Sequence, residues 1–315
     1  MHAFFLLLLA VAWSGTCFAA GYPDKPLRLV VPFVPGGNID ITARTIGPHL
    51  SQVLGQPIVI ENRGGAGGVV GAEVVARSAP DGYTLLLGST GLLTLAPALN
   101  PKNPYDPVRD FAPIGSVSDV PVVLVVHPSL PAKNVKELIA LARSHPGQLT
   151  VARAGISLAG ELFKMRTKVD MIIVGYKGGG DAVRDLIGGH VHAMFDQLSS
   201  ATPHIRSGKV RALAVTAPKR APLFPDIPTL EESGVKDANA STYAGLLAPA
   251  RTPREIVARL NAALATTLAL PETQERFAAL GAQVWPSTPD QFAKVIQSDL
   301  EKWTRVIRTA NIKPE

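Results

Sequence analysis

The clearest potential for chemistry in this chain lies in backbone amides at glycine-rich turns. An apolar run, Leu27–Val31, leads into a turn with Gly36 and Gly37, and a helical pattern begins near Asp40. Adjacent glycines lack the Cβ atoms that would keep a ligand from the backbone, and the first turn of a helix has N–H groups without intrahelical partners. These donors and the positive end of the helix dipole suit an anion such as a carboxylate. A tight turn without a ligand explains the same residues equally well.

Two further glycine-rich stretches come close to nucleotide-binding motifs without completing them. In Gly64–Gly71, Val70 stands where a dinucleotide fingerprint requires glycine, and no acidic residue evidently follows at the spacing of a ribose contact. In Tyr176–Asp181 the lysine precedes the glycines, which is the reverse of a P-loop. We therefore expect both stretches to be helix N-termini without a nucleotide.

Ser157 is the candidate nucleophile, because Gly155–Gly160 matches the nucleophile-elbow motif except at Ala159. A hydrolase would also need a base and an orienting acid, and the sequence places neither beside Ser157. A secreted α/β hydrolase using Ser157 is therefore the alternative function. His190 and His192 offer two imidazoles on one strand face, but no third metal ligand is evident, which favours solvent-facing histidines over a metal site.

Length and composition indicate a globular protein of about two domains. Of the 315 residues, 46% are hydrophobic and 18% are charged. The 31 Lys and Arg residues exceed the 25 Asp and Glu residues by six, but they are scattered and not interleaved with aromatic residues. This pattern argues against a nucleic-acid partner.

The first twenty residues have the character of a signal peptide. The apolar run Phe4–Trp13 is too short for a confident membrane span, and small residues follow it up to Ala20. We expect residues 1–20 to be removed by cleavage near Ala19–Gly21, which leaves a mature chain without cysteine. No Lys or Arg precedes the apolar run, so this prediction rests on the run and the cleavage site. Lipid attachment at Cys17 is the alternative.

Short apolar runs alternate with helical patterns along the mature chain, which is typical of an α/β protein with largely parallel sheets. The expected strands are Leu27–Val31, Ile58–Glu61, Tyr83–Leu87, Val122–Val126, Leu149–Ala152, Met171–Val174, Ala193–Asp196 and Arg211–Ala217.

Three helix starts can be recognised in the sequence, two of them by capping signals. Asn134 is expected to cap a helix that runs to Ser144. Thr252–Glu255 has the pattern of a capping box with proline at the first helical position. The last helix begins at Thr288-Pro289, and its apolar stripe, from Phe292 to Ile307, is expected to pack in a core.

Eight stretches resemble the Bug family, a family of periplasmic solute receptors linked to tripartite tricarboxylate transporters. The stretches follow the same order as in the family and are spread over nearly the whole mature sequence. They are Val31–Asp40, Glu61–Gly68, Ala79–Leu86, Tyr105–Pro113, Pro128–Lys133, Arg211–Thr216, Pro225–Thr229 and Gly245–Ala250.

This resemblance implies a type II-like periplasmic binding protein fold, with two lobes, a ligand cleft and two crossover strands. Residues 21–122 and 244–315 would form the first lobe and residues 123–243 the second. The crossovers would follow Pro121 and return near Tyr243. The implied protein is a periplasmic, non-enzymatic monomer without a cofactor. It would bind a small carboxylate for delivery to membrane transporter subunits or to a sensor kinase.

The resemblance also implies ligand-binding positions on both lobes, with carboxylates held mainly by backbone N–H groups, waters and helix dipoles. In the first lobe they are Phe33, Gly36, Gly37, Asp40, Ser89 and Thr90. In the second they are Gly155 and Ser157 of the loop Ala154–Ser157, then Tyr176, Gly178, Gly179, Phe195 and Asp196. Asp40 could either fix the loop through hydrogen bonds or contact a cationic group of the ligand, and we favour the first role. For Asp196, loop fixing and recognition of an ammonium or hydroxyl group remain equal alternatives.

The chain departs from the family pattern at three places. Val34 and Gly175 each stand where the family commonly has proline or a small residue. The loop Ala154–Ser157 is several residues shorter than usual and lacks a histidine before Leu158. The shorter loop predicts either weak binding or a preference for a bulkier acid that fills the vacated space.

Overall fold

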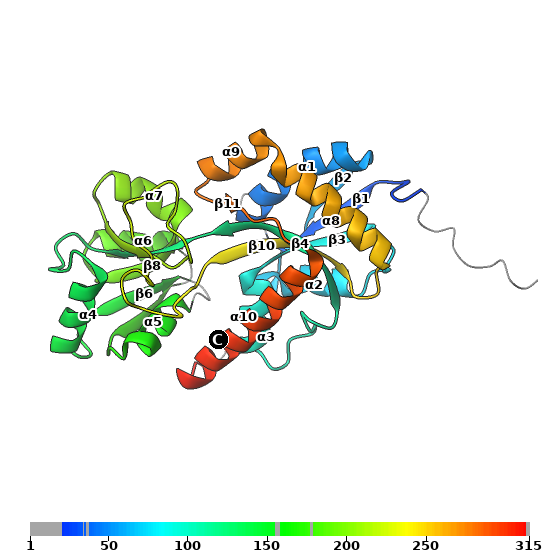
Figure 1. The fold of residues 1–315 in the computed structure, drawn as a ribbon. Coiled ribbons are helices and arrows are strands. Elements are labelled where there is room, and N and C mark those ends of the chain that lie inside the picture. Colours follow the sequence, from blue (N-terminus) through cyan, green and yellow to red (C-terminus); the bar gives the residue numbers. More distant parts are fainter. Residues whose placement is uncertain (1–20, 34, 36–37, 155–157, 177–178, 313–315) are drawn as a thin grey trace, which may run out of the picture.

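The computed structural model of the chain describes residues 21–33, 35, 38–154, 158–176 and 179–312. They form two α/β lobes, each built on its own sheet, and Figure 1 shows the two lobes side by side. The expected signal peptide, residues 1–20, lies outside the described residues.

The sheet of the first lobe has the strand order β11-β4-β10-β3-β1-β2. Its parallel part consists of β1 (Leu27–Val31), β2 (Ile58–Asn62) and β3 (Thr84–Ser89). Its antiparallel part consists of β4 (Phe111–Val120), β10 (Thr242–Pro249) and β11 (Gln283–Val284). The strands β4 and β10 pair along their length and extend toward the second lobe (Figure 1).

The sheet of the second lobe has the order β7-β6-β8-β5-β9. Its strands are β5 (Val122–Val126), β6 (Thr150–Ala154), β7 (Ile172–Tyr176), β8 (Ala193–Gln197) and β9 (Arg211–Val215). The chain enters this sheet just after Pro121 and leaves it between Val215 and Thr242, in agreement with the two expected crossovers.

The expectation of largely parallel sheets is wrong, because both sheets are mixed. In each lobe the strands next to a crossover, β4 and β10 in one and β5 in the other, run antiparallel to their neighbours. The eight expected strands are confirmed, with ends that differ by one or two residues. Strands β4, β10 and β11 were not predicted. In β4, Pro113, Gly115 and two serines interrupt the apolar pattern.

Helices cover the faces of both sheets (Figure 1). They are α1 (Asn38–Leu54), α2 (Val69–Ala76), α3 (Ala96–Leu99), α4 (Val135–Ser144), α5 (Ala159–Thr167), α6 (Gly179–Ile187), α7 (Leu198–Arg206), α8 (Arg254–Ala269), α9 (Pro271–Ala279) and α10 (Pro289–Thr309). A 3-10 turn, Ala66–Gly68, precedes α2, and a π-helical turn, Gly91–Leu95, follows β3.

One of the two expected caps is confirmed, as is the expected start of α10 at Thr288-Pro289. The Asn134 side chain accepts a hydrogen bond from the Glu137 amide at the start of α4. Thr288 and Gln291 form a capping box at the start of α10. The capping box at Thr252 is wrong, because the Thr252 hydroxyl donates to the Pro249 carbonyl (2.8 Å) and Pro253 stands at the N-cap position of α8.

Helix α10 connects the two lobes through its apolar stripe. Phe292 and Ile296 pack in a core of the first lobe with residues of β3 and β10. Trp303, Val306 and Ile307 pack in a core of the second lobe with residues of α4, α5 and β5. The expected core role of the stripe is thus confirmed, and it extends to two cores instead of one.

Candidate ligand cleft

A cavity of about 430 Å³ lies between the two lobes. The first lobe lines it with residues that follow β1 and β3, and the second lobe with residues at the start of α5 and the end of β8. The segment 240–242, just before and at the start of β10, and Trp303 of α10 complete the wall. The carboxyl ends of strands at such a crevice are where ligands bind in α/β proteins. The site therefore consists of parts far apart in the sequence.

The first-lobe wall brings together three predicted residues, Phe33, Ser89 and Thr90. The Thr90 hydroxyl oxygen accepts a hydrogen bond from the Tyr243 amide (2.8 Å), and the Ser89 hydroxyl oxygen accepts a longer one from the Leu92 amide (3.4 Å). A hydroxyl that accepts through its oxygen can still donate its own hydrogen. Ser89 and Thr90 can therefore both donate to an anion.

Asp40 does not line this cavity but holds the loop in front of α1. Asp40 is 2% exposed, and its carboxylate oxygens accept hydrogen bonds from the Asn62 side-chain amide and the Arg44 guanidinium, both at 2.9 Å. The Asn62 side chain also donates to the Phe33 carbonyl (3.1 Å), so the end of β2 is joined to the end of β1. These contacts support the loop-fixing interpretation of Asp40.

The second-lobe wall consists of Leu158 and Ala159 at the start of α5, with Gln197 at the end of β8. The sequence pattern had indicated Asp196, one residue earlier. One Asp196 oxygen accepts a hydrogen bond from the Gln197 amide (2.8 Å), while the other is buried without a hydrogen-bond partner, and burial raises the pKa of this carboxyl. Asp196 therefore helps to hold the turn that presents Gln197.

Other predicted second-lobe residues lie elsewhere. The Tyr176 hydroxyl donates to Asp185 (2.7 Å), and desolvation followed by this hydrogen bond raises the pKa of Tyr176 to about 12. Phe195 packs in the core against Phe163, with ring centroids 5.6 Å apart. Gly179 is the first residue of α6. Gly36, Gly37, Gly155, Ser157 and Gly178 lie outside the described residues.

The polar character of the cavity comes from neutral groups. None of the described residues that line it has a charged side chain. Asn38 is the first residue of α1 and Ala159 the first residue of α5, so one helix from each lobe begins at the cavity. Helix N-termini present N–H donors and a partial positive charge, which stabilise a carboxylate without a cationic side chain. Apolar side chains, among them Phe33, Leu95 and Leu158, form much of the remaining wall.

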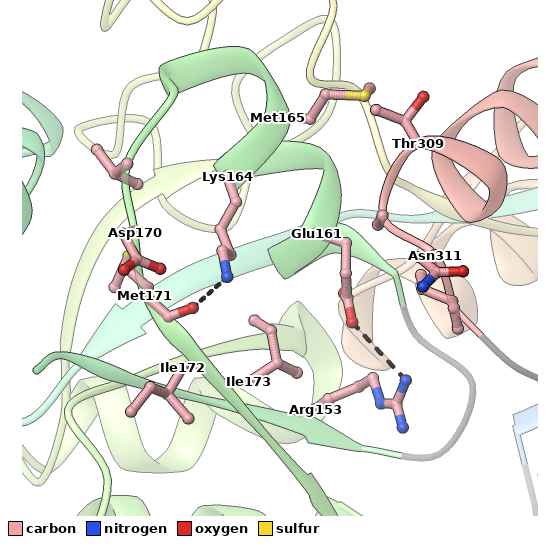
Figure 2. A pocket seen from close by; sticks show the side chains of 13 residues that line it. Arg153, Glu161, Lys164, Met165, Asp170, Met171, Ile172, Ile173, Thr309 and Asn311 are labelled. Carbon is pink, nitrogen blue, oxygen red and sulfur yellow. Dashed lines mark hydrogen bonds and ion pairs between the residues drawn. The ribbon is translucent and has the colours of Figure 1, made fainter. Parts of the chain in front are cut away.

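A larger cavity, about 720 Å³, lies in the second lobe between α5, β7 and the end of α10, and it shares no lining residue with the cleft. Figure 2 shows Arg153 of β6 pointing toward Glu161 of α5, with 3.7 Å between Nη1 and Oε1. Lys164 donates to the Met171 carbonyl. Burial raises the pKa of Glu161, while Arg153 and Lys164 oppose this shift. With Asp170, which also lines this cavity, two basic and two acidic side chains lie together here, away from the cleft.

His190 and His192, which precede β8, have different surroundings. His190 is exposed, and the His192 ring lies within hydrogen-bonding distance of the Thr150 hydroxyl (2.8 Å). Among the described residues, no group of three or more His, Cys, Asp or Glu side chains is arranged to hold a metal ion. In the same part of the chain, no helix has the length and apolar character needed to span a bilayer.

Comparison with known proteins agrees with this architecture. Protein BugT of Bordetella pertussis is 39% identical over 297 residues, which cover 93% of this chain and 91% of BugT. The structure of MatC from Rhodopseudomonas palustris with bound malate is 38% identical, with a TM-score of 0.74, covering 91% of this chain and all of MatC. Rpa4515 of R. palustris with adipate is 35% identical, with a TM-score of 0.78, covering 93% of this chain and all of that one.

The family model of the tripartite tricarboxylate transporter family receptor matches residues 42–312. This range includes both sheets except β1, and all the helices except the first turn of α1. The chain therefore belongs to the tripartite tricarboxylate transporter receptor family, the family of periplasmic solute-binding proteins that includes the Bug proteins.

Proposed function

We propose that this protein is a periplasmic receptor for a small carboxylate with a largely apolar body. It would deliver this ligand, as a monomer, to tripartite tricarboxylate-type transporter subunits or to a sensor kinase. The observation that supports the proposal is the interlobe cavity, where two helix N-termini and four hydroxyl side chains, including those of Ser89 and Thr90, meet apolar walls. The relatives with bound malate and adipate support a carboxylate as the ligand.

The ligand's carboxylate would bind at the starts of α1 and α5, beside Ser89 and Thr90. Its body would contact the apolar side chains of the cavity, which contribute free energy in proportion to the apolar area buried. A volume of about 430 Å³ is within the usual range of small-molecule sites and leaves room beyond a four-carbon acid. This agrees with the bulkier acid that the short loop Ala154–Ser157 predicts.

The family consists of receptors, so we expect the ligand to leave the protein chemically unchanged. Hydrolysis at Ser157 is the alternative. Incubating the protein with carboxylic esters and following their turnover separates the two functions. Turnover that disappears in Ser157→Ala would replace the receptor proposal with the hydrolase.

The decisive experiment measures melting temperature and binding heat with malate, adipate and benzoate. We expect benzoate and adipate to bind more tightly than malate. At a hundredfold excess over the dissociation constant, a bound ligand stabilises the folded protein by roughly 2.7 kcal/mol. Removing the donor in Ser89→Ala should weaken binding by about tenfold, the value of one charge-assisted hydrogen bond.

Ser78→Ala is the matched control, because the Ser78 hydroxyl donates to the Val74 carbonyl near the end of α2, outside the cavity. The Ser78→Ala variant should bind each carboxylate with the affinity of the parent protein. If no carboxylate changes the melting temperature, or if Ser89→Ala binds as tightly as the parent, the proposal is wrong. Export has its own test: intact-mass analysis of a periplasmic extract should find a chain that begins at Ala20 or Gly21.

A further inference from the structure

A second, smaller cavity of about 340 Å³ lies beside the crossovers. The first lobe lines it with Asp119 of β4 and with Gln283–Trp285, at and just after β11. The second lobe lines it with Ala217–Lys219, just after β9, and Ser241 before β10 completes it. Because its walls belong to both lobes, any change in the angle between the lobes changes the size of this cavity.

Asp119 is the half-buried carboxyl in this cavity. Its backbone is in register with Tyr243 on one side and Gln283 on the other, so two neighbouring strands hold it in place. Its Oδ1 atom is buried and has no hydrogen-bond partner. Desolvation raises the pKa of Asp119 to about 6, with a further rise from the Asp299 carboxylate and an opposing effect from the Ser241 side chain. Compared with a hydrated aspartate, Asp119 in this lobe arrangement therefore holds its proton more tightly.

The charged and titratable groups around Asp119 come from three elements. Asp299 of α10 has the same charge as ionised Asp119 and forms an ion pair with Lys302 (2.7 Å). Tyr243 of β10 is a buried phenol whose pKa is raised, and the residues from β11 are uncharged. Among the described residues that line the cavity, Lys219 is the one cation, and it belongs to the second lobe. Lys219 is thus the positive charge that the second lobe offers at the cavity opposite Asp119.

We propose that Asp119 is a proton-controlled switch of the angle between the lobes. When Asp119 is protonated, the lobe arrangement described here is favoured. When it is ionised, it draws Lys219 and water toward it and favours an arrangement in which the carboxylate is better compensated. The switch acts in the ligand-free receptor and does not depend on which carboxylate the cleft binds.

The direction follows from proton linkage. A carboxyl with a raised pKa binds its proton more tightly in this arrangement than in one where it is hydrated, so acid favours this arrangement. The advantage disappears as the pH rises through about 6. A difference of about two pKa units between the arrangements limits the effect to roughly a hundredfold change in their ratio.

Small-angle scattering of the ligand-free mature protein tests the switch. The radius of gyration of the parent should differ between about pH 5 and about pH 7.5, on either side of the titration. Asp119→Asn keeps the shape of the side chain without its charge, and should give the parent's acidic value at both pH values. Lys219→Gln should reduce the change. Glu161→Gln is the matched control, because it removes another carboxyl with a raised pKa, away from the hinge, and should keep the full change.

An equal radius of gyration for the parent at both pH values, or a full pH effect in Asp119→Asn, would overturn the proposal. If Asp119→Asn does not fold, Lys219→Gln decides, because the exposed Lys219 is not part of a core. An undiminished pH effect in Lys219→Gln would then exclude the switch. Since no ligand is present, failure of this test does not affect the proposed carboxylate binding. Failure of the binding experiment likewise does not affect the proposed switch.

Discussion

At the scale of single residues, Asp40 links the loop that precedes α1 to the sheet. Its buried carboxylate accepts hydrogen bonds from Asn62 and Arg44, and Asn62 in turn holds the Phe33 carbonyl at the edge of the cleft. A buried polar group that loses its hydrogen-bond partner destabilises the folded state by its full desolvation free energy. The position of Phe33 in the cleft therefore depends on a carboxylate outside it.

We expect Asp40→Ala to lower the free energy of unfolding by about 1 to 3 kcal/mol, because it leaves the Asn62 amide without this acceptor. Carboxylate affinity should fall as well, because Phe33 and the start of α1 lose their anchor. Urea denaturation and ligand titration measure the two effects. Arg44→Gln is the comparison: the Arg44 side chain is 55% exposed, so its ion pair contributes less than about 1 kcal/mol. Equal losses in the two variants would contradict this role of Asp40.

At the scale of elements, helix starts show which capping signals are realised. Thr288 and Thr252 are each followed by a proline at the start of a helix. Thr288 caps α10, whereas Thr252 does not cap α8. The Thr252 hydroxyl donates to the Pro249 carbonyl at the end of β10 instead. A side-chain hydroxyl can bond to a backbone carbonyl nearby, and this competes with the capping role.

Thr288→Ala should destabilise the protein by about 1 kcal/mol, because α10 loses the acceptor for the Gln291 amide. Gln291→Ala should cost less, and the double variant should cost less than the sum, because the two side chains form one reciprocal box. Urea denaturation of the three variants measures this. Ser298→Ala, on the exposed face of the same helix, should change stability by less than about 0.5 kcal/mol. Additive losses would show that the box does not act as a unit.

At the scale of the whole molecule, α10 shares its side chains between a core of each lobe, as the shorter π-helical turn Gly91–Leu95 also does. Its first half packs against β3 and β10, and its second half against α5 and β5. Side chains that belong to two cores make the unfolding of one lobe costly for the other. We therefore expect the protein to unfold in one cooperative transition, although the lobes have separate sheets.

Trp303→Ala should destabilise the protein by about 3 to 5 kcal/mol, the usual cost of deleting a buried tryptophan side chain. It should also separate the unfolding of the two lobes, seen by calorimetry as a broadened or double transition. Phe277→Ala is the control, because Phe277 is buried in a core of the first lobe alone. This control should lower the melting temperature and keep a single transition. A single sharp transition in Trp303→Ala would argue against α10 as the coupling element.

Much of the fold was predictable from the sequence because the signals are local. Apolar runs such as Leu27–Val31 and Val122–Val126 form strands with the expected limits, and Asn134 and Thr288 cap the helices that follow them. The resemblance to the receptor family implied two lobes, and the family match bears this out. For the strands and the caps, a few neighbouring residues contain the whole signal, whereas the resemblance draws on stretches spread along the chain.

The tertiary structure decided which side chains meet in the cleft. Phe33, Ser89 and Thr90 were predicted there, but Gln197 lines the cavity in place of its neighbour Asp196. Successive side chains of a strand point to opposite faces, so a displacement of one residue exchanges them. Trp303 lies more than two hundred residues from Phe33 in the chain and reaches the same cavity because α10 crosses from one lobe to the other. Local patterns contain no information on such contacts, since they arise only when separate elements pack together.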